Sequence, residues 1–180
     1  DAARGTLNLV HNPSMEFGTD GWTVTSGAMP TLIDTDSHSG TKCARVDMSL
    51  TGAVIVYATR TNLFLAGETY RVSAWMKLVS GTVTGSIGAY YNGDPTVVFP
   101  YTLTGTWTRY SVSYTIPASP PTMSTAQLGF LGNMAGAGVY LIDDVMITRG
   151  PELTAYSRFG TGRHANWCKN GGFDGASTNG

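Results

Sequence analysis

The stretch Thr69-Tyr-Arg-Val-Ser-Ala-Trp-Met-Lys-Leu78 decides the fold class of this 180-residue chain. Two kinds of side chain alternate along it: the apolar set is Tyr70, Val72, Ala74 and Met76, and the more polar set is Arg71, Ser73, Trp75 and Lys77. A period of two residues is typical of a β-strand with one buried face and one face turned outward. The stretch therefore predicts a half-buried strand on which Trp75 points away from the core.

Short alternating runs recur through the rest of the chain, and long helical periodicity is absent. They predict strands at residues 53–61, 82–91, 107–116, 125–131 and 139–148, separated by Gly, Pro, Asn and Asp. A strong turn signal, Asn92-Gly-Asp-Pro95, follows the run that ends at Tyr91. Regularly spaced strands with such punctuation predict an all-β fold, a β-sandwich jelly roll of two antiparallel sheets.

The composition limits the partners that the chain can have. Apolar residues make up 42% of the sequence, enough for a full core, whereas charged residues make up only 13% and the formal net charge is -1. No basic run of the kind that neutralises phosphates is present, so nucleic acid is not an expected partner. No apolar run approaches the roughly 18 residues of a membrane span, so membrane insertion is not expected. The low charge and the many hydroxyl groups favour an extracellular or particle-bound protein.

The end of the chain repeats its beginning. The segment Asn8–Glu16 aligns with Asn166–Asp174 without a gap, so two asparagines, an apolar position and an acidic position keep the same register. Such repetition indicates tandem modules, and coincidence in a tail rich in Gly and Asn is the alternative. We therefore expect a jelly-roll module at residues 1–148, a linker at 149–163 and the truncated start of a second module at 164–180.

Three stretches carry a family resemblance: Asn8–Phe17 with Gly21-Trp22, then His38–Val46, and finally Val139–Ile147. Two more, Tyr70–Lys77 and Gly105–Pro117, lie between them. In this order and spacing they resemble the superfamily of carbohydrate-binding modules that includes families 4, 9 and 22, over residues 6–148. The resemblance implies a jelly roll that binds glycan chains across one concave sheet.

Acidic residues stand in apolar surroundings at two places. Glu16 is expected in an apolar strand beside Met15 and Phe17, and Asp143 and Asp144 interrupt the most hydrophobic predicted strand. Carboxylates in such places are costly unless they are paired or bound to a cation. The resemblance implies a structural calcium ion, Ca2+, that ties the first strand to the last, and calcium takes hard oxygen ligands of this type. The implied ligands are the side chains of Glu16 and Asp143 and carbonyl oxygens near Ser14 and the Gly40-Thr41 turn. The alternative is that the two aspartates only accept hydrogen bonds from backbone amides.

The two cysteines, Cys43 and Cys168, fall in different predicted modules, and we expect no bond between them. Some members of the superfamily that the chain resembles have a disulfide between a cysteine at the position of Cys43 and one just before the acidic pair. Leu141 occupies that second position here. We therefore expect Cys43 to be a free, partly buried thiol, and calcium to be the only cross-link between the ends of the module.

Sugars are bound by aromatic faces and by planar polar groups, so outward-facing side chains of these kinds are the candidates for a glycan site. Strand alternation predicts an outward direction for Tyr57, for Trp75 and for either Tyr90 or Tyr91. Gln127 has the parity opposite to Leu128, so its amide could bond sugar hydroxyl groups. Two further aromatic residues fall in a loop expected at the rim of the cleft. The predicted ligand-binding set is Tyr57, Trp75, Tyr90, Tyr91, Phe99, Tyr101 and Gln127. The alternative for Trp75 is a ring that caps the edge of the sheet.

No catalytic constellation is predicted. The three histidines lack metal-ligand spacing, and Cys43 has no apparent partners for nucleophilic catalysis. Adjacent strand positions put Asp143 and Asp144 on opposite faces, from which they cannot flank one glycosidic bond. We therefore expect a protein that is not an enzyme.

The main hypothesis is a module that binds a polysaccharide or a cell-surface glycan. The alternatives are a structural or adhesion β-sandwich without sugar affinity, and a targeting module of a polysaccharide-degrading enzyme. The segment Met146–Leu153, with Tyr156 and Phe159 after it, resembles the junction that ends such modules in bacteriophage tail proteins. This favours host-surface attachment in a virion tail, with homo-oligomerisation through a larger parent protein.

Overall fold

The computed structural model describes residues 8–10, 12–19, 22–24, 28–48, 54–57, 65–91, 94–118, 126–132 and 138–152. Ten strands occur in these ranges. They are β1 Trp22–Val24, β2 Thr31–Ile33, β3 Cys43–Asp47, β4 Val54–Tyr57, β5 Thr69–Gly81, β6 Thr84–Tyr91, β7 Asp94–Thr102, β8 Thr108–Thr115, β9 Ala126–Gly132 and β10 Gly138–Arg149. Within the same ranges we find no helix with the length and apolar character to cross a membrane.

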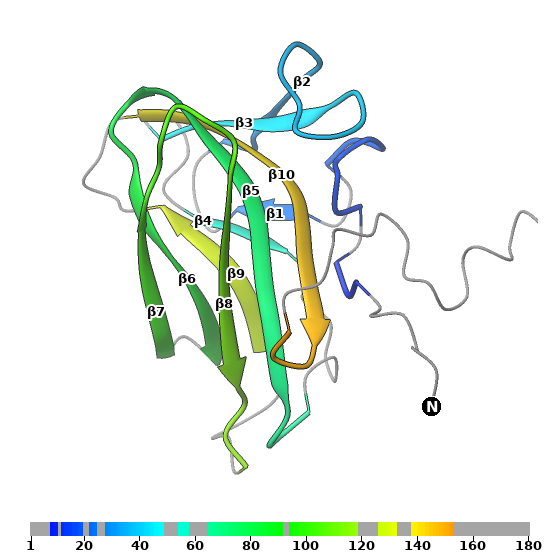
Figure 1. The fold of residues 1–180 in the computed structure, drawn as a ribbon, viewed down its shortest axis with the longest axis vertical. Helices are drawn as coiled ribbons and strands as arrows, with labels where there is room; N and C mark the ends of the chain where they lie inside the picture. Colours follow the sequence, from blue (N-terminus) through cyan, green and yellow to red (C-terminus); the bar gives the residue numbers. More distant parts are fainter. Residues whose placement is uncertain are drawn as a thin grey trace, which may run out of the picture.

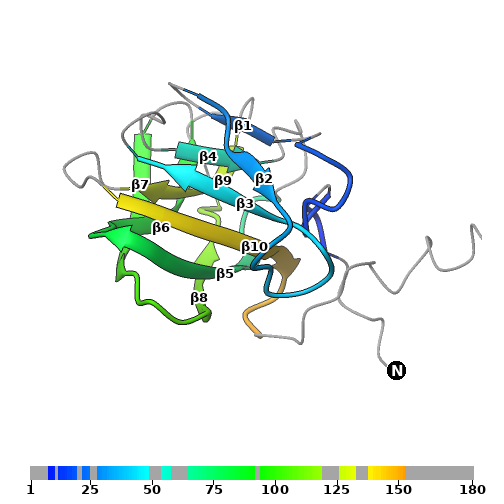
Figure 2. The ribbon, with the colours of Figure 1, turned by 90° about the horizontal axis from the view of Figure 1, so that it is seen from above.

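The strands form two five-stranded sheets. Sheet I has the order β1-β4-β9-β6-β7, and sheet II has the order β2-β3-β10-β5-β8. Each recorded strand pair is antiparallel, and the two sheets lie as stacked layers (Figures 1 and 2). This arrangement confirms the predicted all-β sandwich of two antiparallel sheets.

The core lies between the sheets and follows the alternation read from the sequence. On β5 the side chains of Tyr70, Val72, Ala74 and Met76 are all buried in it. The adjacent strand of the same sheet, β10, contributes Tyr140 and Ile142 to the core. The other face of β5, with Trp75, is turned away from this core, as predicted.

Strand β10 contains a β-bulge at its acidic pair. The register with β5 shifts between Asp143 and Met146, and Asp144 has a φ of 48°, in the left-handed region. A bulge of this kind breaks the strict alternation of a strand. Asp143 and Asp144 consequently contact the same two residues, His38 and Ser39, so the expectation that they point to opposite faces was wrong.

The chain before β1 is held against the last strand by hydrogen bonds. Asn8 donates from Nδ2 to the Val145 carbonyl, at 2.9 Å, and its Oδ1 accepts from the amides of Val10 and Ile147, both at 3.1 Å. The Leu9 amide donates to the Ile147 carbonyl at 2.8 Å. The two ends of the module are thus joined by direct hydrogen bonds.

Two local predictions were wrong. Glu16 lies in a turn and not in a strand, next to Met15, whose φ is 55°. Phe99 and Tyr101, which we placed in a loop, belong to strand β7. The expected linker from residue 153 on, the second module, the 166–174 repeat and Cys168 lie outside the described residues.

Candidate functional site

The predicted ligand-binding residues do not share one sheet. Trp75 lies on β5 of sheet II. The other six lie on four strands of sheet I: Tyr57, Tyr90, Tyr91, Phe99, Tyr101 and Gln127. A single glycan chain lying on one sheet therefore cannot contact the whole set.

The register of sheet I brings some of these positions together. Tyr90 on β6 is paired with Gln127 on β9, and Gly88 is paired with Gly129 two positions along. Tyr57 on β4 is paired with both Leu128 and Trp22, and the Trp22 side chain is buried in the core. The side chains of Tyr57, Tyr90, Tyr91, Phe99 and Gln127 lie outside the described part of the structure.

Tyr101 does not face a cleft. Its side chain is only 7% exposed and belongs to the core, where its ring lies 5.4 Å from that of Tyr110 in a tilted contact. Burial, with smaller effects of Tyr140 and Tyr110, raises the pKa of Tyr101 well above its usual value. The prediction that Tyr101 contacts a bound sugar was therefore wrong.

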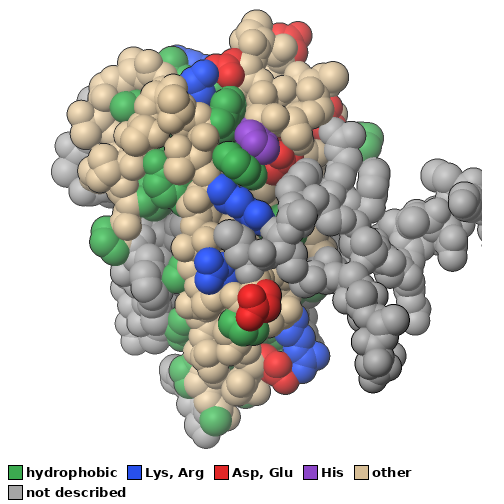
Figure 3. Space-filling view, in the orientation of Figure 1, with side chains coloured by type: hydrophobic (Ala, Val, Ile, Leu, Met, Phe, Trp, Pro, Cys, Tyr) green, Lys and Arg blue, Asp and Glu red, His purple; other side chains and the backbone are tan. Residues whose placement is uncertain are grey.

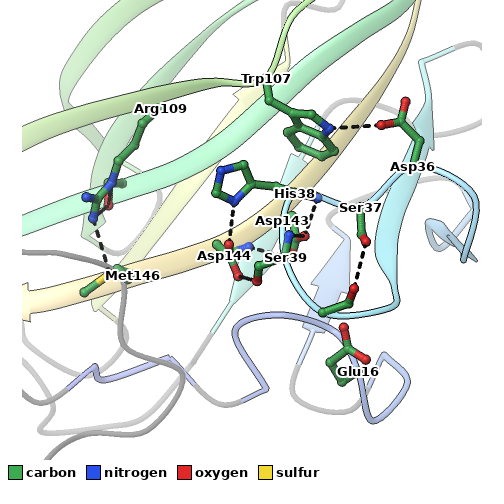
Figure 4. Close-up of polar contacts among 12 residues, drawn as sticks. Glu16, Asp36, Ser37, His38, Ser39, Trp107, Arg109, Asp143, Asp144 and Met146 are labelled. Atoms are coloured by element: carbon green, nitrogen blue, oxygen red, sulfur yellow. Dashed lines mark hydrogen bonds and ion pairs between the residues drawn. The ribbon is translucent and has the colours of Figure 1, made fainter.

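Trp75 is covered by the segment between β2 and β3. The His38 ring stacks on the Trp75 ring at a centroid distance of 3.8 Å and an interplanar angle of 14°. Trp107 meets His38 edge-on at 5.8 Å (Figure 4). The Trp75 ring is therefore covered by His38 and is not an open platform for a sugar, although β5 is not the edge strand that the capping alternative supposed.

Asp36 fixes this covering segment in place. Its carboxylate accepts a hydrogen bond from Trp107 Nε1 at 3.0 Å and forms an ion pair with Lys77 Nζ at 2.7 Å. The bond from Lys77 lowers the pKa of Asp36, and the weaker bond from Trp107 acts in the same direction. The Cys43 thiol also donates to the Asp36 carbonyl, at 3.2 Å. Residues of β3, of β5 and of the segment just before β8 thus all contact Asp36.

The acidic pair of β10 lies beneath the same segment. Asp143 Oδ2 accepts from the amides of His38 and Ser39, at 3.0 and 3.1 Å. Asp144 accepts from the His38 ring and from the Ser39 hydroxyl, both at 2.7 Å. Burial and the charge of Asp144 raise the pKa of Asp143 to about 7, against the opposing effect of its amide hydrogen bonds. Both carboxyl groups are buried, so this segment separates them from any substrate.

The predicted calcium ligands surround one turn. Glu16 accepts from the Thr41 amide at 2.7 Å, from the Lys42 amide at 3.0 Å and from the Thr41 hydroxyl at 2.6 Å. The Gly40 carbonyl accepts a hydrogen bond from the Ser37 hydroxyl at 3.2 Å. Ser14 is buried. Backbone amides thus donate to Glu16 and Asp143, whereas the recorded donors to Asp144 are the side chains of His38 and Ser39.

The donor set nevertheless suits a hard cation. It consists of carboxylate and carbonyl oxygens, which are the hard ligands that calcium takes. The described residues contain no group of three or more His, Cys, Asp or Glu side chains able to hold a metal, so backbone oxygens would have to complete the shell. Calcium remains a prediction on these grounds.

Cys43 is a free cysteine with no exposed surface. This agrees with the expected free thiol at Cys43, which is more deeply buried than expected. Burial and the nearby charges of Asp143 and Asp36 raise the pKa of Cys43 to about 12. Leu141, at the position of the missing disulfide partner, is itself buried.

Sequence reasoning missed the role of Asp36 and of Arg109. Arg109 lies on the outer face of sheet II, where it donates from Nε and Nη2 to the hydroxyl of Ser73. The alternation at residues 107–115 carried a usable signal, since Trp107, Arg109, Ser111 and Ser113 all have the parity opposite to the buried Val112 and Tyr114. No comparable pattern marks Asp36, because its contacts depend on the folding of a loop.

The family of the chain follows from its sequence as well as from this fold. The family model of the carbohydrate binding domain, for families 4 and 9, matches residues 7–133. The chain therefore belongs to this family of carbohydrate binding domains. Among curated proteins, the comparison found no match.

Solved structures of such modules share the fold. The C-terminal family 22 carbohydrate binding module of Clostridium thermocellum Xyn10B has a TM-score of 0.64 at 18% identity, over 85% of this chain and 100% of that chain. The CBM22-1 xylan-binding domain from Paenibacillus barcinonensis Xyn10C has a TM-score of 0.61 at 20% identity, over 85% and 100% of the two chains. The enzymatically active domain of tailspike protein 4 of bacteriophage CBA120 matches at a TM-score of 0.54 and 18% identity, over 80% of this chain but only 22% of that chain.

Proposed function

We propose that this chain is a non-catalytic module that binds a polysaccharide on the outer face of sheet I, centred on Tyr90 and Gln127. Membership of the carbohydrate binding domain family supports binding of a glycan. The observation that carries the location is the direct pairing of Tyr90 with Gln127 on adjacent strands in the middle of the sheet.

Register separates this face from the core. Positions 57 and 128 are paired with each other, and position 57 is also paired with the buried Trp22. Positions 127 and 90 follow in alternation, so they belong to the opposite face. An aromatic ring and an amide at neighbouring positions are suited to a sugar ring and its hydroxyl groups.

A pair of glycines extends the same face. Gly88 and Gly129 are directly paired two positions from Tyr90 and Gln127, and they share their parity. Because glycine has no side chain, paired glycines leave a low floor where another chain can approach the sheet backbone. The combination resembles a groove for an extended glycan, with Tyr90 and Gln127 at its side.

Affinity electrophoresis in gels that contain xylan, β-1,4-galactan or bacterial surface polysaccharide tests this proposal. The wild-type chain should be retarded by at least one of them. Tyr90→Ala and Gln127→Ala should each weaken binding by roughly tenfold, which corresponds to about 1.4 kcal/mol. Phe17→Ala is the matched control, because Phe17 is an aromatic residue that is 72% exposed and lies on neither sheet. A chain that is not retarded by any of the polysaccharides would favour the structural or adhesion alternative.

We also propose a structural calcium ion at the turn between β2 and β3, with Glu16 and Asp143 as side-chain ligands and Ser14, Gly40 and Thr41 as sources of carbonyl oxygens. Support comes from the hard oxygen donors and from the raised pKa of Asp143, whose buried carboxyl group lies beside that of Asp144. Bound calcium compensates the charge of these carboxyl groups and links the N-terminal segment to β10.

Melting temperatures measured with calcium and with a chelator test the calcium proposal. The wild-type chain should melt at a higher temperature with calcium, and Glu16→Gln should remove this difference. Equal melting temperatures of the wild-type chain in the two conditions would contradict it.

The parent context is proposed to be a bacteriophage virion, in which the module attaches to the host surface as part of an oligomeric tail or receptor-binding protein. The shared fold with a domain in a bacteriophage tailspike chain and the junction at Met146–Leu153 support this context. Several copies on one particle would strengthen weak single-site binding. Labelled protein should bind isolated envelopes of the host bacterium, and extraction of the surface polysaccharide should abolish that binding.

A further inference from the structure

Two arginines approach one another on the outer face of sheet II, opposite to the proposed glycan face. Arg71 lies on β5 and Arg109 on β8. The directly paired residues Ser73 and Ser111 lie between them. Figure 3 shows basic side chains following one another down this face, over β5 and β8.

Both guanidinium groups reach the same serine pair from opposite strands. Arg71 donates from Nη2 to the Ser111 hydroxyl at 2.8 Å and from Nη1 to the Ser113 hydroxyl at 2.7 Å. Arg109 donates from Nε and Nη2 to the Ser73 hydroxyl, at 3.3 and 3.0 Å. The serines thus hold both cations over one point of the sheet.

Arg71 has donors to spare in this arrangement. Among the described residues, its one other hydrogen bond is to the Pro151 carbonyl, at 3.5 Å, and its buried Nε has no partner there. A guanidinium has five N–H donors, so Arg71 keeps some that the described chain does not use. All of its recorded acceptors are neutral oxygens, and among the described residues it forms no ion pair.

The two charges repel each other. Burial and then the charge of Arg71 lower the pKa of Arg109, and Asp144 opposes this with a smaller effect. An anion placed beside the two guanidinium groups reduces this repulsion. The geometry, with its pre-positioned donors, is that of an anion site.

Aromatic side chains adjoin the pair on the same face. Trp75 is directly paired with Arg109, and Trp107 lies two positions before Arg109, immediately ahead of β8. Trp107 is partly exposed, with its Nε1 held by Asp36 and its ring against His38. A ligand that carries both an anionic group and an apolar ring face fits this combination better than a small inorganic anion does.

We propose that Arg71 and Arg109 form a second glycan site, on sheet II, which binds the carboxylate of a uronic acid residue while Trp107 contacts the sugar ring. A guanidinium forms charge-assisted hydrogen bonds with a carboxylate, and the Arg71 Nη2 group keeps one N–H beside its bond to Ser111. This site is separate from the proposed neutral glycan site on sheet I. Either proposal can therefore be refuted by its own test while the other stands.

Titration of the isotope-labelled full chain with trigalacturonic acid, followed by NMR, tests the assignment. Shifted amides should lie on β5 and β8, and binding should weaken as salt rises to about 0.5 M because charged contacts are screened. The double variant Arg71→Gln and Arg109→Gln should bind at least roughly tenfold more weakly, in line with the loss of charge-assisted bonds. If this variant does not fold, Arg71→Lys with Arg109→Lys keeps both charges but not the guanidinium groups, and it should also bind more weakly.

Two control variants separate this site from other effects. Arg45→Gln removes a cation from β3 of the same sheet, and Tyr90→Ala alters only the sheet I face, so both should bind trigalacturonic acid as the wild type does. Neutral galactotriose should not shift β5 or β8. The proposal is overturned if trigalacturonic acid shifts no amide on β5 or β8, or if the double variants bind it unchanged. It is also overturned if inorganic phosphate binds there equally well, since the site would then recognise negative charge and not a sugar.

Discussion

Replacement of Asn8 by alanine should destabilise the module strongly, although Asn8 lies outside every strand. Its side chain makes three buried hydrogen bonds: to the Val145 carbonyl and from the amides of Val10 and Ile147. Alanine fills none of these roles, so the three backbone groups lose their partner. At about 1 kcal/mol for each lost bond, the free energy of unfolding should fall by about 3 kcal/mol.

Urea denaturation followed by fluorescence measures this change, with thermal melting as a second measurement. For a chain of this size, a loss of about 3 kcal/mol corresponds to a melting temperature lower by about 6–12 °C. Thr106→Ala is the control, since Thr106 is exposed and its hydroxyl makes only a 3.3 Å contact with Thr104. A loss in Asn8→Ala below about 0.5 kcal/mol, the range of ordinary surface substitutions, would refute the idea that Asn8 anchors the chain to β10.

Two further predictions concern the core and the thiol. Gly138→Ala should lower stability by about 1–3 kcal/mol, because a Cβ there would lie 2.5 Å from Cγ2 of Val83, whereas Gly105→Ala has open space and should be neutral in the same denaturation assay. In a Cys168→Ser variant, Cys43 should not react with a thiol reagent at pH 8 until the chain is unfolded, because its pKa is raised to about 12 and it is fully buried. Rapid labelling of the folded variant would contradict this placement of Cys43.

The alternating pattern was sufficient to predict the sandwich and the buried face of β5. A period of two residues reflects a local property of a strand, so Tyr70, Val72, Ala74 and Met76 could be assigned to the core from sequence. Strand β7 was missed in part because it contains Pro95 and Pro100. It is an edge strand of sheet I, where proline is tolerated.

The candidate site was harder to predict because it depends on pairings between distant strands. Alternation alone placed Tyr57 on the outer face, but its partner across the sheet is the buried Trp22. Sequence also could not show that Trp75 and Tyr90 belong to different sheets. The bulge at Asp144 and the covering of Trp75 by His38 likewise arise from tertiary contacts that no local pattern records.

The most direct test of polysaccharide binding on sheet I is an NMR titration of the wild-type chain with neutral xylan and galactan oligosaccharides. Our account predicts that the amides shifted by a bound oligosaccharide lie on β6 and β9, around the paired Tyr90 and Gln127. Shifts confined to sheet II, or none with any oligosaccharide that the affinity gels select, would contradict it.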